Sequence, residues 1–230
     1  MTKLLGVVGR RTFALAFSTI AASACSKHEV TAPAAVSYSV KPLAGSAALY
    51  GVVGQHMQTP VTVVVTDAAG KPQAGVEVTF SAGGGATLDQ ATATTNAYGE
   101  ASDFVTLGTT TGTTTISATA RNSSTTVSIT ALPGAAVALV PIGADSVAVP
   151  TGQTAQLTVR AVDQFGNVVP GVPIEWHTDG QATVLAAPTV TGPDGTATLS
   201  VSDVATETFH VTAALAGLED AVVSFLITEL

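Results

Sequence analysis

Few side chains in this sequence have the type and spacing that catalysis or metal binding requires. The chain has one cysteine and four histidines in 230 residues: Cys25, His28, His56, His177 and His210. The histidines are scattered and lack the spacing of zinc ligands. His177 and His210 fall on outward positions of expected strands, as solvated surface histidines do. We therefore expect no metal site and no cofactor.

Carboxylates and glycines give no stronger signal for an active site. The aspartates Asp145, Asp163, Asp179 and Asp194 are isolated, whereas calcium needs six to eight oxygen ligands. The run SAGGGAT (81–87) lacks the Lys-Ser/Thr of a phosphate-binding loop, and no Gly-x-Ser-x-Gly turn is present. We predict no catalytic residues. A hydrolase remains an alternative only if Glu100, Asp103 or Asp194 meets a histidine in one pocket.

The single cysteine lies at the end of an apolar N-terminal segment. Lys3, Arg10 and Arg11 precede an apolar run over about 12–22, which is typical of a secretory signal and too short for a permanent span. The adjacent arginines leave both the general and the twin-arginine export routes open. Ala22-Ser23-Ala24-Cys25 resembles the lipobox of bacterial lipoproteins, although Ala22 stands where Leu is usual. The resemblance implies that Cys25 is the lipid attachment residue.

Charge and composition favour an exported β-protein. Charged residues make up 10% of the chain and apolar residues 46%, and Val, Thr and Gly are abundant. Beyond residue 24 there are 5 basic and 16 acidic residues, a net charge of −11. This charge repels nucleic acid, so we exclude a nucleic-acid partner.

We predict a signal peptide over 1–24 and a polar tether over 25–34, with a membrane as partner through the lipid anchor.

One sequence motif, called the repeated phrase below, occurs twice in the remaining sequence. DAAGKPQAGVEVTF (67–80) and DQFGNVVPGVPIEW (163–176) lie 96 residues apart. Later segments realign at an offset of 93, where TTTISATA (113–120) meets TETFHVTA (206–213). Repeats of this length are whole domains, and we place them at 35–132 and 135–230. In each phrase, the aspartate and the first glycine predict a turn after a strand.

Both repeats alternate apolar and polar residues with a period of two. This pattern, in short runs separated by turn residues, predicts a two-sheet antiparallel sandwich. The apolar positions of the first repeat are Val61, Val63, Val65, Val76, Val78, Phe80, Ile116, Ala118 and Ala120. Those of the second are Leu157, Val159, Ala161, Val172, Ile174, Trp176, Phe209, Val211 and Ala213.

Asp103 breaks the alternation, because it aligns with the inward Leu199 and burial of an unpaired carboxylate is costly. A bulge after Gly99 would turn Phe104 inward instead, and an edge strand is the alternative. We expect the bulge.

The repeated motif resembles a known family of domains. Asp-x-x-Gly-x-x-x-x-Gly-Val-x-Val-x-Phe, with a later Thr-x-x-x-Gly-x-Ala and a closing Thr-x-x-Ala-Thr-Ala, is similar to the bacterial immunoglobulin-like type 1 repeats of invasin and intimin. The resemblance implies an all-β fold of two tandem immunoglobulin-like antiparallel β-sandwiches, without the usual disulfide and stacked as a rod. It also implies a protein or glycan ligand at the cell surface, although we expect no lectin-like tip of the invasin type in these residues.

Three classes of function follow from these observations. The first is a non-enzymatic, lipid-anchored adhesion or spacer module at the outer membrane or cell surface. The second is a carbohydrate- or protein-binding accessory module of a cell-envelope complex, which clustering of Tyr38, Tyr50 or Tyr98 on one exposed surface would favour. The third is the hydrolase considered above, which the missing motifs disfavour.

Overall fold

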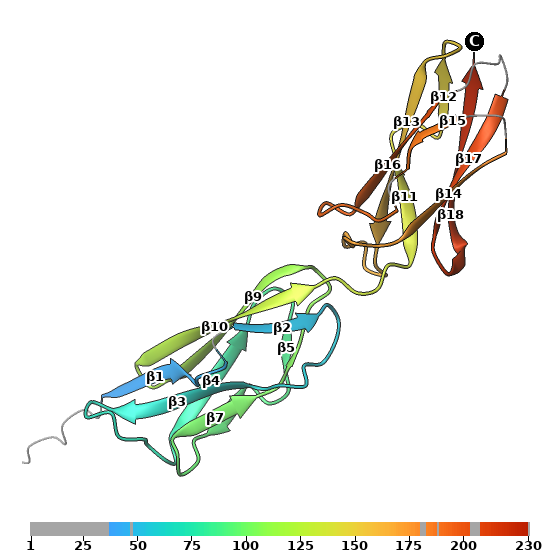
Figure 1. Cartoon of the computed structure of the whole chain (residues 1–230). Coiled ribbons are helices and arrows are strands. Elements are labelled where there is room, and N and C mark those ends of the chain that lie inside the picture. Colours follow the sequence, from blue (N-terminus) through green and yellow to red (C-terminus); the bar gives the residue numbers. More distant parts are fainter. Residues whose placement is uncertain (1–36, 47, 180–182, 188, 203–207, 230) are drawn as a thin grey trace, which may run out of the picture. The chain divides into compact units, whose positions relative to one another are not determined.

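The structure is a computed structural model that describes residues 37–46, 48–179, 183–187, 189–202 and 208–229. Within these residues the regular secondary structure consists of strands, numbered β1 to β18 (Figure 1). Strands β1 to β10 form sandwich 1, and β11 to β18 form sandwich 2. No helix in the described ranges is long and apolar enough to cross a membrane.

Sandwich 1 has two main sheets and a short ribbon. The first sheet has the order β1-β3-β7, formed by β1 (Tyr38–Pro42), β3 (Val61–Asp67) and β7 (Glu100–Asp103). The second has the order β2-β10-β9-β4-β6, formed by β2 (Ala48–Val52), β10 (Ser123–Leu132), β9 (Gly112–Ala120), β4 (Glu77–Ala82) and β6 (Thr92–Thr94). The ribbon pairs β5 (Thr87–Leu88) with β8 (Val105–Thr106). All pairings are antiparallel except that of β2 with β10.

Sandwich 2 has two sheets of four strands each. The first has the order β11-β13-β16-β15, formed by β11 (Ala138–Ile142), β13 (Thr154–Val162), β16 (Thr196–Ser202) and β15 (Thr183–Ala186). The second has the order β12-β18-β17-β14, formed by β12 (Ser146–Val149), β18 (Leu218–Glu229), β17 (Thr208–Leu215) and β14 (Ile174–Thr178). The edge strand β12 pairs in parallel with β18, as β2 does with β10 in sandwich 1.

Each sandwich has its own apolar core, built from the alternating positions of the sequence. The nine predicted apolar positions of sandwich 1 are all buried. In sandwich 2, Val172 and Trp176 are half-buried and pack against the core, and the other seven are buried. The prediction of an all-β sandwich fold is therefore confirmed.

The two repeats pair their strands with slightly different registers. Phe80 lies opposite Ala118 in sandwich 1, whereas Trp176 lies opposite Ala213 in sandwich 2. Because Phe80 and Trp176 are equivalent, their partners Ala118 and Ala213 are also equivalent, and these lie 95 residues apart rather than the predicted 93. The faces were still assigned correctly, because a shift of two residues leaves every side chain on the same side of a strand.

The repeated phrase forms the same corner in both sandwiches. Asp67 accepts hydrogen bonds of 2.9 Å at Oδ1 from the amides of Ala69 and Lys71. Asp163 accepts equivalent bonds from the amides two and four residues further on, also at 2.9 Å. Gly70 and Gly166 both have φ of 81°, a left-handed conformation that favours glycine. The aspartates and glycines of the phrase therefore determine backbone geometry.

Asp103 is buried in its strand, and the predicted bulge is wrong. Strand β7 pairs with β3 without a register shift and places Asp103 opposite Val61. Phe104 is 38% exposed, whereas Asp103 is 4% exposed. The alternative of an edge strand holds, because β7 is the outer strand of its sheet. At this edge the carboxylate accepts hydrogen bonds from the amides of Ala91 and Phe104, both at 2.8 Å, so its burial is compensated.

Candidate functional site

The predicted lipid attachment residue, Cys25, lies outside the described residues, as does His28. Its role as an acylation site stays a prediction.

The three described histidines lie on the surface, each near one carboxylate. His56 Nε2 is 3.2 Å from Asp89 Oδ2, and His210 Nδ1 is 3.0 Å from Asp179 Oδ2. His177 is 3.9 Å from Glu175. The expected outward positions of His177 and His210 are confirmed, because both are exposed. The described ranges contain no group of three His, Cys, Asp or Glu residues that could hold a metal ion.

Hydrogen bonds explain the acidity of the carboxylate paired with His210. The backbone amide of His210 donates to Asp179 Oδ1 at 2.6 Å. This bond, with a smaller contribution from the His210 ring, lowers the pKa of Asp179. A solvent-exposed carboxylate with a lowered pKa is ionised at neutral pH, so it cannot act as a general acid there.

The carboxylates named for a hydrolase have separate structural partners. Asp103 Oδ2 accepts from the Ala91 amide, as described above. Glu100 accepts a hydrogen bond of 3.0 Å from the Asn96 side chain. Asp194 accepts from the hydroxyl and the amide of Thr196, and these bonds lower its pKa. Among the described residues, the histidines pair with Asp89, Glu175 and Asp179 rather than with these three carboxylates, so the geometry does not favour a hydrolase.

The exposed tyrosines are not clustered in one place. Tyr50, on β2, is 68% exposed and lines one hollow of sandwich 1. Tyr38, on β1, is half-buried and lines a different hollow. Tyr98 is 73% exposed in the turn before β7 and lines neither hollow. The clustering that would have supported an aromatic binding platform is therefore absent for these three described tyrosines.

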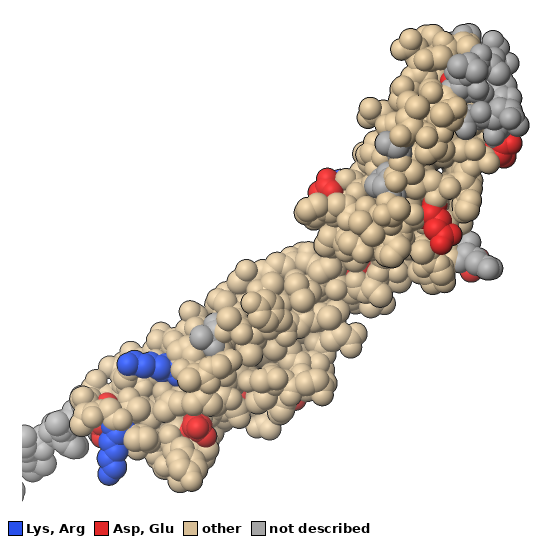
Figure 2. Space-filling view, in the orientation of Figure 1, with Lys and Arg blue, Asp and Glu red and all other residues tan. Residues whose placement is uncertain are grey.

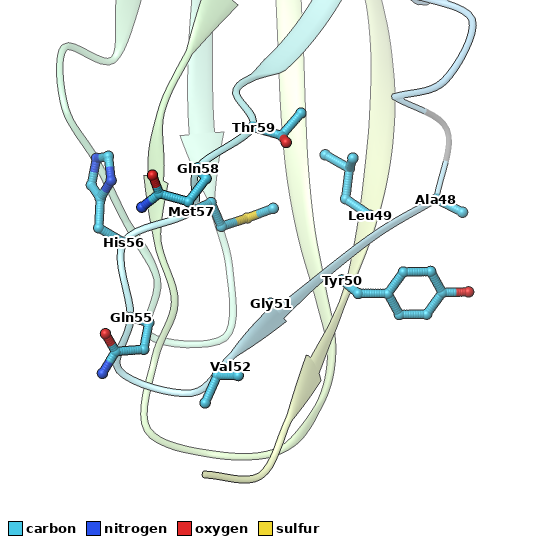
Figure 3. Close-up of a pocket in the computed structure, with 10 residues that line it drawn as sticks. All are labelled: Ala48, Leu49, Tyr50, Gly51, Val52, Gln55, His56, Met57, Gln58 and Thr59. Atoms are coloured by element: carbon cyan, nitrogen blue, oxygen red, sulfur yellow. The ribbon is translucent and has the colours of Figure 1, made fainter.

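The hollow beside β2 has a volume of about 520 Å³ and a mainly apolar floor. Leu49 and Met57 are buried beneath it. Figure 3 shows the rings of His56 and Tyr50 on opposite sides, pointing away from each other. His56 instead stacks on Phe104, with ring centroids 5.5 Å apart. Because polar side chains do not converge on this hollow, it lacks the arrangement typical of a ligand site.

The second hollow of sandwich 1 is polar and has a volume of about 590 Å³. It is lined by Tyr38, Ala74, Gly75, Val76, Glu77, Thr79, Thr119 and Arg121. The guanidinium carbon of Arg121 lies 5.4 Å from the centre of the Tyr38 ring, in a cation–π contact. Charged side chains are sparse on the face of the molecule shown in Figure 2, so a cation beside a polar hollow is unusual here.

Sequence reasoning missed two buried threonines that hold the corners in place. Thr95 Oγ1 donates to the carbonyl of Gln73 at 2.6 Å and accepts from the amide of Val76 at 2.9 Å. Thr191, 96 residues later, forms the same pair of bonds, to Val169 and Val172. The sequence did contain a signal for this role, because a threonine occurs at the same position of both repeats, 96 residues apart.

The comparisons with known proteins match this fold. The model of the bacterial Ig-like domain (group 1) matches residues 55–132 and 143–226. The chain belongs to this family and carries two tandem copies of its domain. No curated protein matched the sequence.

Solved structures of adhesins share the fold. InvD of Yersinia pseudotuberculosis is 21% identical with a TM-score of 0.59, over 84% of this chain and 57% of that one. The Escherichia coli adhesin FdeC is 19% identical with a TM-score of 0.50, over 84% of this chain and 66% of that one. Invasin, a bacterial integrin-binding protein, is 22% identical with a TM-score of 0.39, over 84% and 39%. The chain thus spans less than two thirds of each of these structures. The similarity to InvD and FdeC supports the fold alone, that of Ig-like sandwich domains.

Proposed function

We propose that the chain is a non-enzymatic, surface-anchored lipoprotein whose Ig-like domains act as an adhesion or spacer module. The observation that carries this proposal is the presence of two tandem domains of a family whose fold occurs in adhesins. The corner aspartates support it, because their oxygens bind backbone amides of the turns rather than facing a cleft. We assign domain 1 to 35–132 and domain 2 to 135–230, after a signal peptide over 1–24 and a tether over 25–34.

The proposed anchor is a set of acyl chains on Cys25. Each buried methylene contributes about 0.8 kcal/mol, so more than one chain gives stable membrane attachment. The anchor would hold the domains on the outer membrane or at the cell surface. Replacement of the residue by serine removes the thiol while keeping its size, so Cys25→Ser tests the anchor directly.

The experiment compares cells that express the wild-type chain with cells that express Cys25→Ser. Membrane fractionation and incorporation of a labelled fatty acid report anchoring, and antibody labelling of intact cells reports surface exposure. We expect the wild-type chain in the membrane fraction with label, and the variant in the released fraction without it. Equal membrane retention of both chains would contradict the anchor.

Adhesion is tested with the same two strains. Cells that carry the anchored wild-type chain should adhere to host-cell or matrix-coated surfaces more strongly than cells that express the released Cys25→Ser variant. Equal adherence across such surfaces would contradict adhesion and leave the spacer role, in which the domains hold another component away from the membrane.

A carbohydrate- or protein-binding accessory module is a second candidate. The observation that favours it is the polar hollow of sandwich 1, where Arg121 packs on Tyr38. Arginine on an aromatic ring, beside hydroxyl groups, is a recognition surface rather than a catalytic one.

A further inference from the structure

We propose that the polar hollow of sandwich 1 binds a carboxylated saccharide, with Arg121 holding the carboxylate. This inference rests on the binding-module candidate and does not require the lipid anchor. It starts from the backbone of Arg121, which has φ of 53°. Arg121 is the first residue of the two-residue turn between β9 and β10, where a left-handed conformation favours glycine.

The matching hairpin of sandwich 2 has its left-handed residue at the second position of the turn rather than the first. There the turn between β17 and β18 contains Ala216 and Gly217, and its left-handed residue is the glycine, with φ of 81°. Sandwich 1 instead places a long cationic side chain in the left-handed conformation. The strained backbone of Arg121 is unfavourable for folding, and such strain in a protein is often associated with a functional role.

The side chain of Arg121 is free to bind a ligand. Its guanidinium carbon lies over the Tyr38 ring, and a cation–π contact uses none of the N–H donors for a hydrogen bond. No carboxylate in the described part of the chain lies within 4.0 Å of it in an ion pair. Arginine with free edge donors binds a carboxylate through two parallel hydrogen bonds.

The rest of the hollow supplies partners for hydroxyl groups. Thr79 and Thr119 lie directly opposite each other on β4 and β9 and both line the hollow. Glu77 lines it from the start of β4, two residues before Thr79 and on the same face of the strand. Two hydroxyls and one carboxylate can donate to and accept from the several hydroxyls of a sugar ring.

Charge decides between the anionic ligands that Arg121 could hold. Glu77 shares the hollow, so a dianionic phosphate would be repelled more strongly than a singly charged carboxylate. The net charge of −11 beyond residue 24 opposes long polyanions. A sugar with one carboxylate, such as a hexuronic acid, fits both the cation and the hydroxyl-binding face.

The test uses the full chain purified in a mild detergent and saturation-transfer difference NMR. The probes are sodium glucuronate, glucose and acetate, whose carbon-bound protons are observed directly, and inorganic phosphate, whose binding is measured by its competition with glucuronate. Glucose differs from glucuronate at the carboxylate, and acetate supplies the carboxylate without the ring. We expect saturable binding of glucuronate and at least ten-fold weaker binding of the other three probes, about the effect of one lost charged hydrogen bond.

Two substitutions of Arg121 separate binding from folding. Arg121→Gly suits the turn, so we expect an unchanged or raised melting temperature together with at least ten-fold weaker glucuronate binding. Arg121→Gln removes the charge but keeps a polar side chain, and we expect the same loss of binding. Arg160→Gln, at an exposed arginine on β13, is the matched control and should bind as the wild type does.

Several outcomes would overturn the proposal. They are absence of glucuronate binding by the wild type, unchanged binding by both Arg121 variants, and equal binding of acetate or phosphate. Because purified protein is used, these results do not depend on whether Cys25 is acylated. A failed anchor with intact glucuronate binding would remove the lipoprotein proposal alone.

Discussion

The carboxylate of Asp163 accepts a hydrogen bond of 2.9 Å from the backbone amide of Gly134. This bond ties the segment before β11 to the corner that follows β13. The side chain and amide of Asn167 and the amide of Phe165 donate to the same carboxylate. Burial acts to raise the pKa of Asp163, but these hydrogen bonds outweigh it and hold the pKa below its ordinary value of 3.8.

Asp163→Asn should lower the stability of the chain at neutral pH. A carboxylate with a lowered pKa contributes stability that is present above its unfolded pKa and is lost as the pH falls through its folded pKa. We expect the variant to be about 1–3 kcal/mol less stable at pH 7, with this difference shrinking below about pH 4. Chemical denaturation between pH 7 and pH 3 measures it. Asp145→Asn, at an exposed site, is the control, and a pH-independent difference would contradict the assignment.

Gly75, in the corner of sandwich 1, and Gly99, which packs against that corner, differ in the space around them, so substitution should have unequal effects. A Cβ on Gly99 would lie 2.6 Å from the carbonyl oxygen of Val65, whereas a Cβ on Gly75 would meet nothing within 4 Å. Both have positive φ, 74° and 73°, so alanine is strained equally at the two sites. We expect Gly75→Ala to cost about 1 kcal/mol and Gly99→Ala at least about 2 kcal/mol more. Urea unfolding of the two variants provides the comparison, and equal losses would contradict this account.

The sequence predicted what depends on local periodicity and turn chemistry. Val61, Val63 and Val65 were placed correctly on the inner face because alternation alone determines the face of a strand. The carboxylate of Asp67 was correctly assigned to its own turn because its partners are within four residues. Contacts between distant segments left no such pattern.

Long-range contacts explain what sequence analysis missed. The partner that compensates the buried Asp103 is the amide of Ala91, 12 residues away, so the sequence alone led to the wrong prediction of a bulge. The packing of Arg121 on Tyr38 joins residues from two strands far apart in the chain, and its strain at φ of 53° has no sequence signature. The polar hollow of sandwich 1 could therefore not be predicted from the sequence, because its lining residues come from separate strands.

Replacement of Asp103 by the residue at its repeat position should destabilise sandwich 1. Leu199 lies opposite Leu157 as Asp103 lies opposite Val61, so leucine suits the same place in the other sandwich. In sandwich 1, however, Asp103→Leu would leave the amides of Ala91 and Phe104 without their acceptor. We expect a loss of about 1–3 kcal/mol, measured by thermal and chemical unfolding, because two partly buried hydrogen bonds to the carboxylate are lost. The reciprocal Leu199→Asp should also destabilise, and a neutral Asp103→Leu would show that the amides find water instead.

Glycine at Ala91 should stabilise the chain. Ala91 has φ of 62°, and its amide and carbonyl are both used, by Asp103 Oδ2 and by the amide of Phe80 at 2.7 Å. These bonds hold a left-handed conformation that costs an alanine about 1 kcal/mol and costs glycine nothing. The greater freedom of glycine in the unfolded chain offsets part of the gain, so we expect Ala91→Gly to raise the free energy of unfolding by about 0.5 kcal/mol. Ala93→Gly, in the neighbouring strand β6, is the control and should lower it, because glycine weakens a strand where no positive φ is needed. Equal losses from both substitutions would show that the backbone at Ala91 is not strained in solution.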